Sequence, residues 1–152
     1  MKGPVNDREM KDKPSVWLYP IKPRNWRIIK KVKLLGFPKA AKKVVNEIKP
    51  GDIIVFHVLK PVNGIVAMGT VTSNVFEDYS DIWGTNRYPL RIKIEISDSH
   101  TRDEHNPVPI SALMGSTEKS EVEIEPYLRN VWIVKITEKQ YKNLIRCFSS
   151  LP

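Results

Sequence analysis

Little in this sequence could constrain the chain covalently or place it in a membrane. Its single cysteine, Cys147, excludes an internal disulfide. No apolar run approaches the roughly 18–20 residues that a membrane-spanning helix needs. The first fifteen residues, MKGPVNDREMKDKPS, are polar and lack the apolar core of a signal peptide. These absences predict a soluble, cytoplasmic protein that is held together by hydrophobic packing.

The chain also lacks the motifs of the commonest enzyme classes. It contains no Walker A loop, no GxGxxG, no GxSxG and no HExxH. His57 falls in a predicted strand, and His100 and His105 fall in a polar loop whose spacing fits no strong metal-ligand pattern. We therefore predict no catalytic residue, no bound metal and no cofactor. The alternative is a metal-dependent hydrolase or modifying enzyme of nucleic acids that uses the acidic loop 98–105.

Acidic residues are missing from one long segment. Residues 22–43 hold nine Lys or Arg and no Asp or Glu, in a chain whose net charge is +8 and whose pI is about 9.6. Clustered cations favour a polyanionic partner, although a basic run also occurs as a solvated helix face. The interleaved Trp26 and Phe37 favour contact with nucleic acid. A protein partner with an acidic surface is a further alternative.

Length and periodicity predict one domain. The 152 residues, of which 41% are hydrophobic, suit a single core over residues 16–150 that follows a disordered or linker-like segment, 1–15. The run VWLY at 16–19 is typical of a strand. Apolar spacing predicts a helix from Trp26 to about Leu34, with Gly36 as its left-handed stop. Pro38 then opens a second short helix.

The remaining segments predict strands and one closing helix. The apolar run IIVFHVL follows KPGD, and Asn63-Gly64 predicts a type I′ hairpin into GIVAMGTVTS. YPLRIKIEI alternates, which places Leu90, Ile92, Ile94 and Ile96 inside and Arg91, Lys93 and Glu95 outside. PISALMG predicts a helical turn, and VWIVKI predicts a strand. Thr137 and Gln140 form a capping box ahead of the apolar stripe Tyr141, Leu144, Ile145 and Phe148.

The fold class that follows is α+β, with a small curved, mostly antiparallel sheet or barrel flanked by helices. Several of these segments, in their order and spacing, resemble the EVE domain family, whose sister family is the YTH domains within the PUA-like superfamily. The specific parts are Asn-Trp at a helix start, GFP after the helix, KPGD before a buried strand, the GTVTS hairpin return and YPLRIKI. The resemblance spans about residues 16–96.

The resemblance implies a PUA-like barrel whose pocket accepts a flipped, modified base of DNA or RNA, such as a methylated adenine or cytosine. A base taken out of its stack loses energy that aromatic side chains replace, at about 1–3 kcal/mol per base. Leu35 stands where many relatives carry a Trp, so either Phe37 is the substitute wall or the pocket accepts a different base. The implied pocket residues are Tyr19, Pro20, Ile21, Asn25, Leu35, Gly36, Phe37 and Trp83.

Three of the aromatic and polar residues also have structural interpretations. Asn25 is either a reader of the base edge or a helix N-cap. Trp83 is either a pocket wall or a lid over the end of the barrel, and Trp26 begins the apolar stripe of its helix. The residues expected to contact phosphates are Lys22, Arg24, Lys39, Lys42, Lys43 and Arg87. Similar domains occur alone or as recognition modules of McrB-type restriction systems, so the partners implied are modified DNA or RNA and an AAA+ motor with a nuclease.

Overall fold

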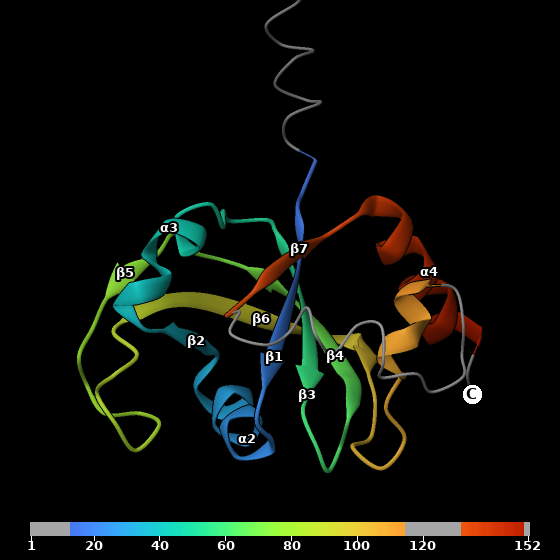
Figure 1. Cartoon of the computed structure of the whole chain (residues 1–152), viewed down its shortest axis with the longest axis horizontal. Helices are drawn as coiled ribbons and strands as arrows, with labels where there is room; N and C mark the ends of the chain where they lie inside the picture. Colours follow the sequence, from blue (N-terminus) through green and yellow to red (C-terminus); the bar gives the residue numbers. More distant parts are fainter. Residues whose placement is uncertain (1–12, 115–131, 151–152) are drawn as a thin grey trace, which may run out of the picture.

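The computed structural model describes residues 13–114 and 132–150. Within these residues, seven strands form one sheet in the order β2-β6-β4-β3-β1-β7, with β5 paired to β6 (Figure 1). β1 and β3 are parallel, and the other pairs are antiparallel. The strands are β1 (Val16–Ile21), β2 (Leu34–Phe37), β3 (Ile53–Val58), β4 (Gly64–Val71), β5 (Phe76–Glu77), β6 (Leu90–Thr101) and β7 (Val134–Ile136).

Helices cover both faces of this curled sheet, as the α+β pattern predicted. On one face lie α2 (Pro23–Val32), the 3₁₀ turn η1 (Lys39–Ala41) and α3 (Lys42–Val45). On the other face, η2 (Ile110–Met114) packs with α4 (Glu138–Ser150), and Figure 1 shows the pair side by side. Along β1 and β3, buried side chains alternate between the two faces, so this part of the sheet separates two hydrophobic cores.

The first helix begins and ends earlier than its apolar spacing predicted. Pro23 occupies the first turn, where its missing N–H costs nothing, and the residue that ends the helix is Lys33. Lys33 adopts the left-handed conformation, with φ of 58°, and its N–H donates to the Ile29 carbonyl at 2.8 Å. Gly36 is therefore not a helix stop, because the chain has already entered β2. Trp26 is buried in the core, with its ring 4.8 Å from that of Phe56.

Two further details of the sequence prediction are wrong. The hairpin between β3 and β4 forms as predicted, but only Asn63 of the Asn63-Gly64 pair has positive φ, so the turn is not type I′. Arg91 was expected on the solvent face of its strand, yet it is 0% exposed. As predicted, the side chain of Arg91 points to the face of β6 away from Leu90 and Ile92. That face is not open to solvent here, because the loop that contains Ser80 and Tyr88 covers it and encloses the side chain.

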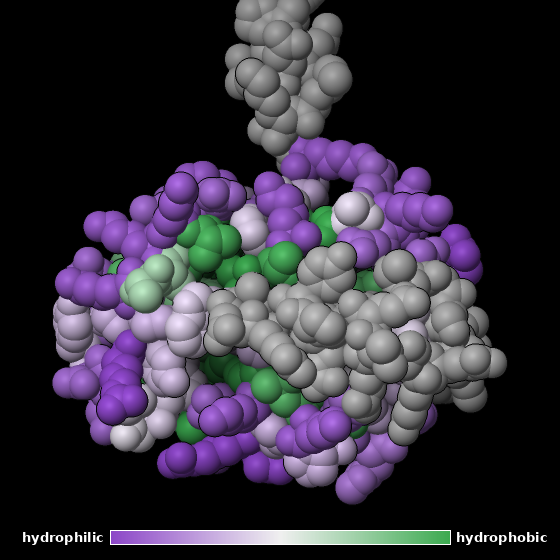
Figure 2. Space-filling model, viewed as in Figure 1, coloured by the Kyte–Doolittle hydropathy of each residue, from purple (hydrophilic) through white to green (hydrophobic). Residues whose placement is uncertain are grey.

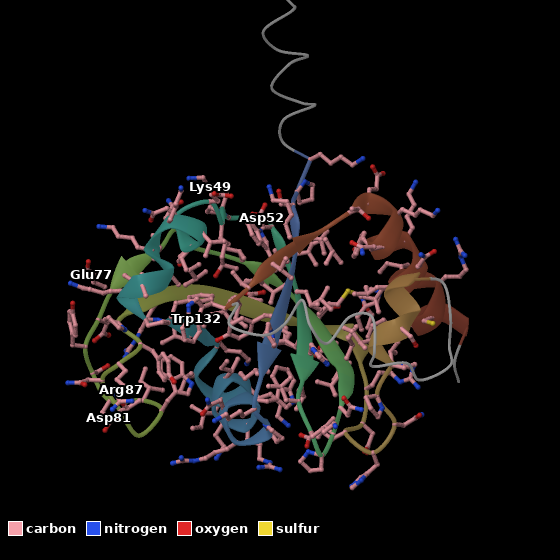
Figure 3. The ribbon with its side chains drawn as sticks, viewed as in Figure 1. Lys49, Asp52, Glu77, Asp81, Arg87 and Trp132 are labelled. Atoms are coloured by element: carbon pink, nitrogen blue, oxygen red, sulfur yellow. The ribbon has the colours of Figure 1, made fainter. Side chains whose placement is uncertain are left out.

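The KPGD segment shapes the approach to β3 through one buried carboxylate. Asp52 accepts hydrogen bonds from the indole N–H of Trp17 at 3.0 Å, the Lys49 N–H at 3.0 Å and the Ser15 N–H at 3.1 Å. Figure 3 places Lys49 and Asp52 together at this turn. Gly51 supplies the positive φ, 94°, that the turn requires. These bonds attach the start of β1 to the start of β3.

The closing helix is capped as predicted. The Thr137 N–H donates to the Gln140 side-chain oxygen at 2.8 Å, and the Gln140 N–H donates to the Thr137 hydroxyl at 3.1 Å. Leu144, Cys147 and Phe148 are buried in the second core. Most of the predicted linker-like start (1–12) and the polar stretch 115–131 lie outside the described residues. Lys13, at the end of that start, pairs with Glu138 at 2.8 Å.

Candidate functional site

A cavity of about 240 Å³ lies between the two edges of the curled sheet, with β2 on one side and the β1/β7 edge on the other. Figure 2 shows a hollow on this face, beside α2, where hydrophobic residues lie deep between hydrophilic ones. The volume of this cavity is just below the size range of small-molecule sites, about 300–1,000 Å³, so the cavity suits a ligand no larger than a single ring system. Its lining consists of Tyr19, Pro20, Ile21, Lys22, Asn25, Gly36, Phe37, Leu59, Trp83, Tyr88 and Trp132.

Tyr19 connects the two edges of the sheet inside this cavity. Its hydroxyl, carried by β1, donates to the carbonyl of Gly36 on β2 at 3.2 Å. Burial raises the pKa of the Tyr19 phenol well above its ordinary value, so the hydroxyl stays protonated and remains a donor. The Tyr19 ring meets Phe37 edge to face, with the centroids 5.4 Å apart. The cavity wall on this side is therefore aromatic and fixed in position.

Trp83 forms another wall, and it depends on Gly36 having no side chain. A Cβ on Gly36 would lie 2.6 Å from two carbons of the indole ring, which is closer than nonbonded carbons approach. The indole therefore lies against the bare backbone of β2. Trp83 is only 5% exposed although its loop is on the surface, and its ring meets that of Tyr88 at 90° with centroids 6.1 Å apart.

The buried Arg91 holds the loop that carries Trp83. From β6, its guanidinium donates to the Ser80 hydroxyl at 2.8 Å, to the Ser80 carbonyl and, through Nε, to the Tyr88 carbonyl at 3.1 Å. Asp78 lies 3.5 Å from the same group, and the guanidinium carbon is 5.1 Å from the Trp83 ring centroid. A buried charge is stable only when it is paired and hydrogen-bonded, and this loop supplies both.

Polar groups reach the cavity from the first turn of α2. Asn25 is the third residue of this helix, so it is not the N-cap, a position that Lys22 occupies without a side-chain cap bond. The Asn25 side-chain amide makes no hydrogen bond to any described residue, and it lines the cavity. The first turn holds no acidic residue. Lys22 and the positive end of the helix dipole thus favour an electron-rich or anionic group here.

One predicted residue does not line the cavity, and three residues that line it were not predicted. Leu35 is 0% exposed and packs in the first core, together with Phe37, which also reaches the cavity from the end of β2. Leu59, Tyr88 and Trp132 also line the cavity but were not predicted, although Tyr88 begins the YPLRIKI motif. Only the curled sheet brings these three distant segments together.

The predicted phosphate contacts are dispersed rather than gathered at one edge. Lys22 lines the cavity, and Arg24 lies beside the Trp83 loop, since a Cβ on Gly84 would be 3.3 Å from its guanidinium. Lys39 lies 5.6 Å from the ring centroid of Tyr79, whose hydroxyl bond raises the pKa of this lysine. Figure 3 shows Arg87 and Asp81 on the outer part of the loop. Lys42 and Lys43 are exposed on α3.

The histidines take structural positions. His100 Nδ1 lies within hydrogen-bond distance of the Ser97 and Ser99 hydroxyls, and its ring packs on Phe148 with centroids 5.6 Å apart. His57 is buried in β3, where desolvation lowers its pKa to about 4 and neither ring nitrogen has a hydrogen-bond partner in the part of the chain that the structure describes. Within residues 13–114 and 132–150, no three His, Cys, Asp or Glu side chains gather as metal ligands.

The fold and this cavity define a PUA-like domain with an aromatic pocket between its sheet edges. The sequence agrees with that class, because the model of the EVE domain family matches residues 15–147. The chain belongs to the EVE domain family. A UPF0310 protein of Pyrococcus horikoshii is 33% identical over 96 residues, which cover 53% of this chain and 65% of the relative. The chain thus spans just under two thirds of that relative's length.

Solved structures with low sequence identity share the fold. The YTH domain of Zygosaccharomyces rouxii MRB1, solved in complex with N6-methyladenosine RNA, has a TM-score of 0.62 and 16% identity, and the match covers 90% of this chain and 88% of that one. Human THYN1, solved with 5-methylcytosine-containing DNA, has a TM-score of 0.59 and 10% identity, with coverage of 91% and 99%. These likenesses confirm the predicted PUA-like architecture.

Other parts of the sequence interpretation stay predictions. The association with an AAA+ motor and a nuclease remains an expectation. In the described residues, none of the helices combines the length and the apolar character required to cross a bilayer. The cytoplasmic location is likewise a prediction.

Proposed function

We propose that this protein is a non-catalytic nucleic-acid-binding module that takes a flipped, modified base into the cavity between β1 and β2. The observation that carries the proposal is one cavity whose walls are aromatic and whose lining includes a lysine and the Asn25 amide, which has no hydrogen-bond partner among the described residues. Neither feature alone indicates a base. Together they match the two things a flipped base requires, which are a surface for stacking and polar groups for its edge.

The walls provide the stacking surface. Tyr19, Phe37, Trp83 and Tyr88 surround the cavity, and the edge-to-face contacts among them keep their rings in place. A methyl group on a base is apolar, so it gains free energy by leaving water for such a wall, at about 0.8 kcal/mol for each buried carbon group. The walls therefore support a preference for a methylated over an unmodified base.

The mouth provides the polar contacts. Asn25 offers one carbonyl acceptor and two N–H donors, which is the combination that reads a base edge bidentately. Lys22 and Arg24 flank it on the first turn of α2 and are exposed, as phosphate-binding side chains must be. Because phosphate contacts do not depend on sequence, they position the strand while the cavity determines which base is retained.

Binding of matched oligonucleotides tests this proposal. Wild type and Trp83→Ala are compared on single- and double-stranded DNA and RNA that are unmodified or carry N6-methyladenine, 5-methylcytosine or 5-hydroxymethylcytosine. We expect wild type to prefer one modification, and Trp83→Ala to lose about 5- to 150-fold in affinity for it, which corresponds to about 1–3 kcal/mol of stacking. Trp83→Phe should retain part of the preference.

Tyr79→Ala is the matched control, because Tyr79 lies on the same loop, is 50% exposed and does not line the cavity. Circular dichroism of each variant shows whether it is folded, so that an affinity lost with the indole is distinguished from an affinity lost by unfolding. Equal affinity of wild type for all modified and unmodified oligonucleotides would contradict the proposal. Turnover of any of these substrates would contradict its non-catalytic part.

A further inference from the structure

Trp132 differs from the other tryptophans of the chain in its exposure. Trp17, Trp26 and Trp83 are 1%, 1% and 5% exposed, whereas Trp132 is 45% exposed. It is also not isolated on the surface, because it lines the same cavity as Trp83. A half-exposed indole loses the free energy that burial would give a large aromatic ring. The ring is therefore available to stack against a further aromatic surface.

The residues that follow Trp132 are held in the fold, while its own side chain is half-exposed. The next residue, Ile133, is buried in the core, and β7 then pairs with β1 through Val134 opposite Leu18. Continuing that register by two residues places Trp132 opposite Pro20, which has no N–H to donate to a partner strand. Trp132 thus lies just beyond the paired part of β7, at the rim of the cavity (Figure 3).

Trp83 and Trp132 come from opposite edges of the sheet. Trp83 lies against Gly36 of β2, whereas Trp132 leads into β7, at the other end of the strand order. Trp83 is only 5% exposed, so it offers little ring surface beyond the wall that it forms. Trp132 is 45% exposed, so it offers a much larger ring surface at the same cavity. We therefore expect the two indoles to stack on two different ligand rings and not on the two faces of the same ring.

We propose that Trp132 is a stacking platform for the base next to the flipped base in the same strand. The inference rests on the proposed function, because the cavity fixes where the flipped base lies. Successive phosphates of a strand are about 3.4 Å apart along a duplex, so the neighbour of a base in the cavity must lie at its rim. Lys22 lines the same rim and provides a cation for the phosphate that links the two nucleotides.

Stacking with an adjacent base is not selective for modification, since every base has a π face. Trp132→Ala is therefore expected to weaken binding of modified and unmodified oligonucleotides by the same factor, about 5- to 150-fold. The ratio of the two affinities, which the cavity determines, should not change. Trp83→Ala should instead reduce mainly the ratio of the affinity for modified strands to the affinity for unmodified strands.

The experiment uses single-stranded DNA that carries 2-aminopurine beside a central adenine, N6-methyladenine, cytosine or 5-methylcytosine. Binding of wild type should quench the 2-aminopurine fluorescence, because stacking on an indole quenches it. Trp132→Ala should bind more weakly and quench less, and Trp132→Phe should restore part of both effects. Tyr79→Ala removes an equally exposed aromatic outside the cavity and should behave like wild type.

Each other outcome has a distinct meaning. If Trp132→Ala binds and quenches like Tyr79→Ala, the platform does not exist. If it loses the preference for the modified base, Trp132 is a wall of the cavity and the inference is wrong. If wild type shows no preference for any modification, the proposed function fails, but the platform is still tested by the loss of affinity and quenching on the unmodified strand.

Discussion

The two faces of the sheet are built from the same strands but serve different purposes. The face under α4 and η2 is a closed hydrophobic core, with Leu144, Ile65 and Val108 at 0% exposure. The face under α2 is also buried for most of its area, yet it opens into the aromatic cavity between β2 and β1. Alternation along a strand assigns neighbouring residues to the two faces, so one sequence segment contributes to both.

This difference indicates where stability and binding can be separated. On the closed face the core side chains are buried against other parts of the chain, so removing their atoms leaves a void. On the open face the rings around the cavity are held by a few specific contacts, such as the hydroxyl of Tyr19 on Gly36. Substitutions on the first face should change the free energy of unfolding, and substitutions on the second should change affinity.

The largest effect on stability should come from Leu144→Ala on the closed face. Leu144 is fully buried in α4, so truncation leaves a cavity and should lower the free energy of unfolding by about 2–5 kcal/mol. Urea unfolding at pH 7 measures the change. Lys142→Ala, on the exposed side of the same helix, is the control. Weakened oligonucleotide binding by folded Leu144→Ala would show that the two faces are not independent.

Arg91→Met should affect both properties, because Arg91 lies beneath the loop of the open face. Loss of the guanidinium leaves the Ser80 and Tyr88 carbonyls without their donor and should cost about 3 kcal/mol of stability. The released loop should also weaken binding of the preferred oligonucleotide. Arg91→Lys keeps the charge but not the planar fork, so it should rescue only part of the loss.

The matched control for Arg91 is Arg87→Met, since Arg87 is an exposed arginine on the same loop. It should leave the urea midpoint unchanged. Unaltered stability and binding in Arg91→Met would mean that the loop is held by its own packing and that the arginine is dispensable.

The smallest of the stability effects concerns His57, which alternates with Phe56 and Val58 and therefore faces the closed side. Its folded pKa of about 4 lies below the ordinary value of 6.5, so the unfolded chain binds the proton more tightly. Stability should consequently fall as the pH drops through the window from 6.5 to 4, by about 2 kcal/mol between pH 7 and pH 5. Above pH 6.5 the histidine should contribute no pH dependence.

His57→Met should remove this part of the pH dependence, as measured by urea unfolding at pH 7 and pH 5. His105→Met is the control, because His105 is an exposed loop histidine. An identical loss of stability in wild type and His57→Met would assign the acid sensitivity to other groups.

Much of the fold could be predicted from local patterns. The capping box at Thr137 and Gln140, the buried run after KPGD and the alternation of β6 each depend on neighbours within a few residues. The predictions were wrong where contacts with a segment far away in the sequence determine the environment of a residue. Arg91 reads as a solvent-facing residue until the loop 78–88 covers it. Gly36 reads as a helix stop, whereas it lies in β2 and pairs with the distant β6.

The candidate site, too, was predicted only in part from the sequence. The residues of β1, β2 and the first turn of α2 were identified because they lie within one short segment that resembles a known family. Tyr88 and Trp132 were missed because their proximity to the cavity depends on the curl of the sheet. Leu35 was included because of its position in the family resemblance, but the structure buries it completely in the first core, away from the cavity lining.

Net charge, helix and strand periodicities and caps are local properties of the chain, so they were sufficient to predict a basic α+β domain. The sequence by itself also determined which family the protein resembles. Only the tertiary structure decided which aromatic rings share a cavity and which of them is exposed, since the two edges of the sheet meet through contacts between residues far apart in the chain. The physical reason is that burial is a property of the packed whole, and no side chain specifies by itself what will cover it.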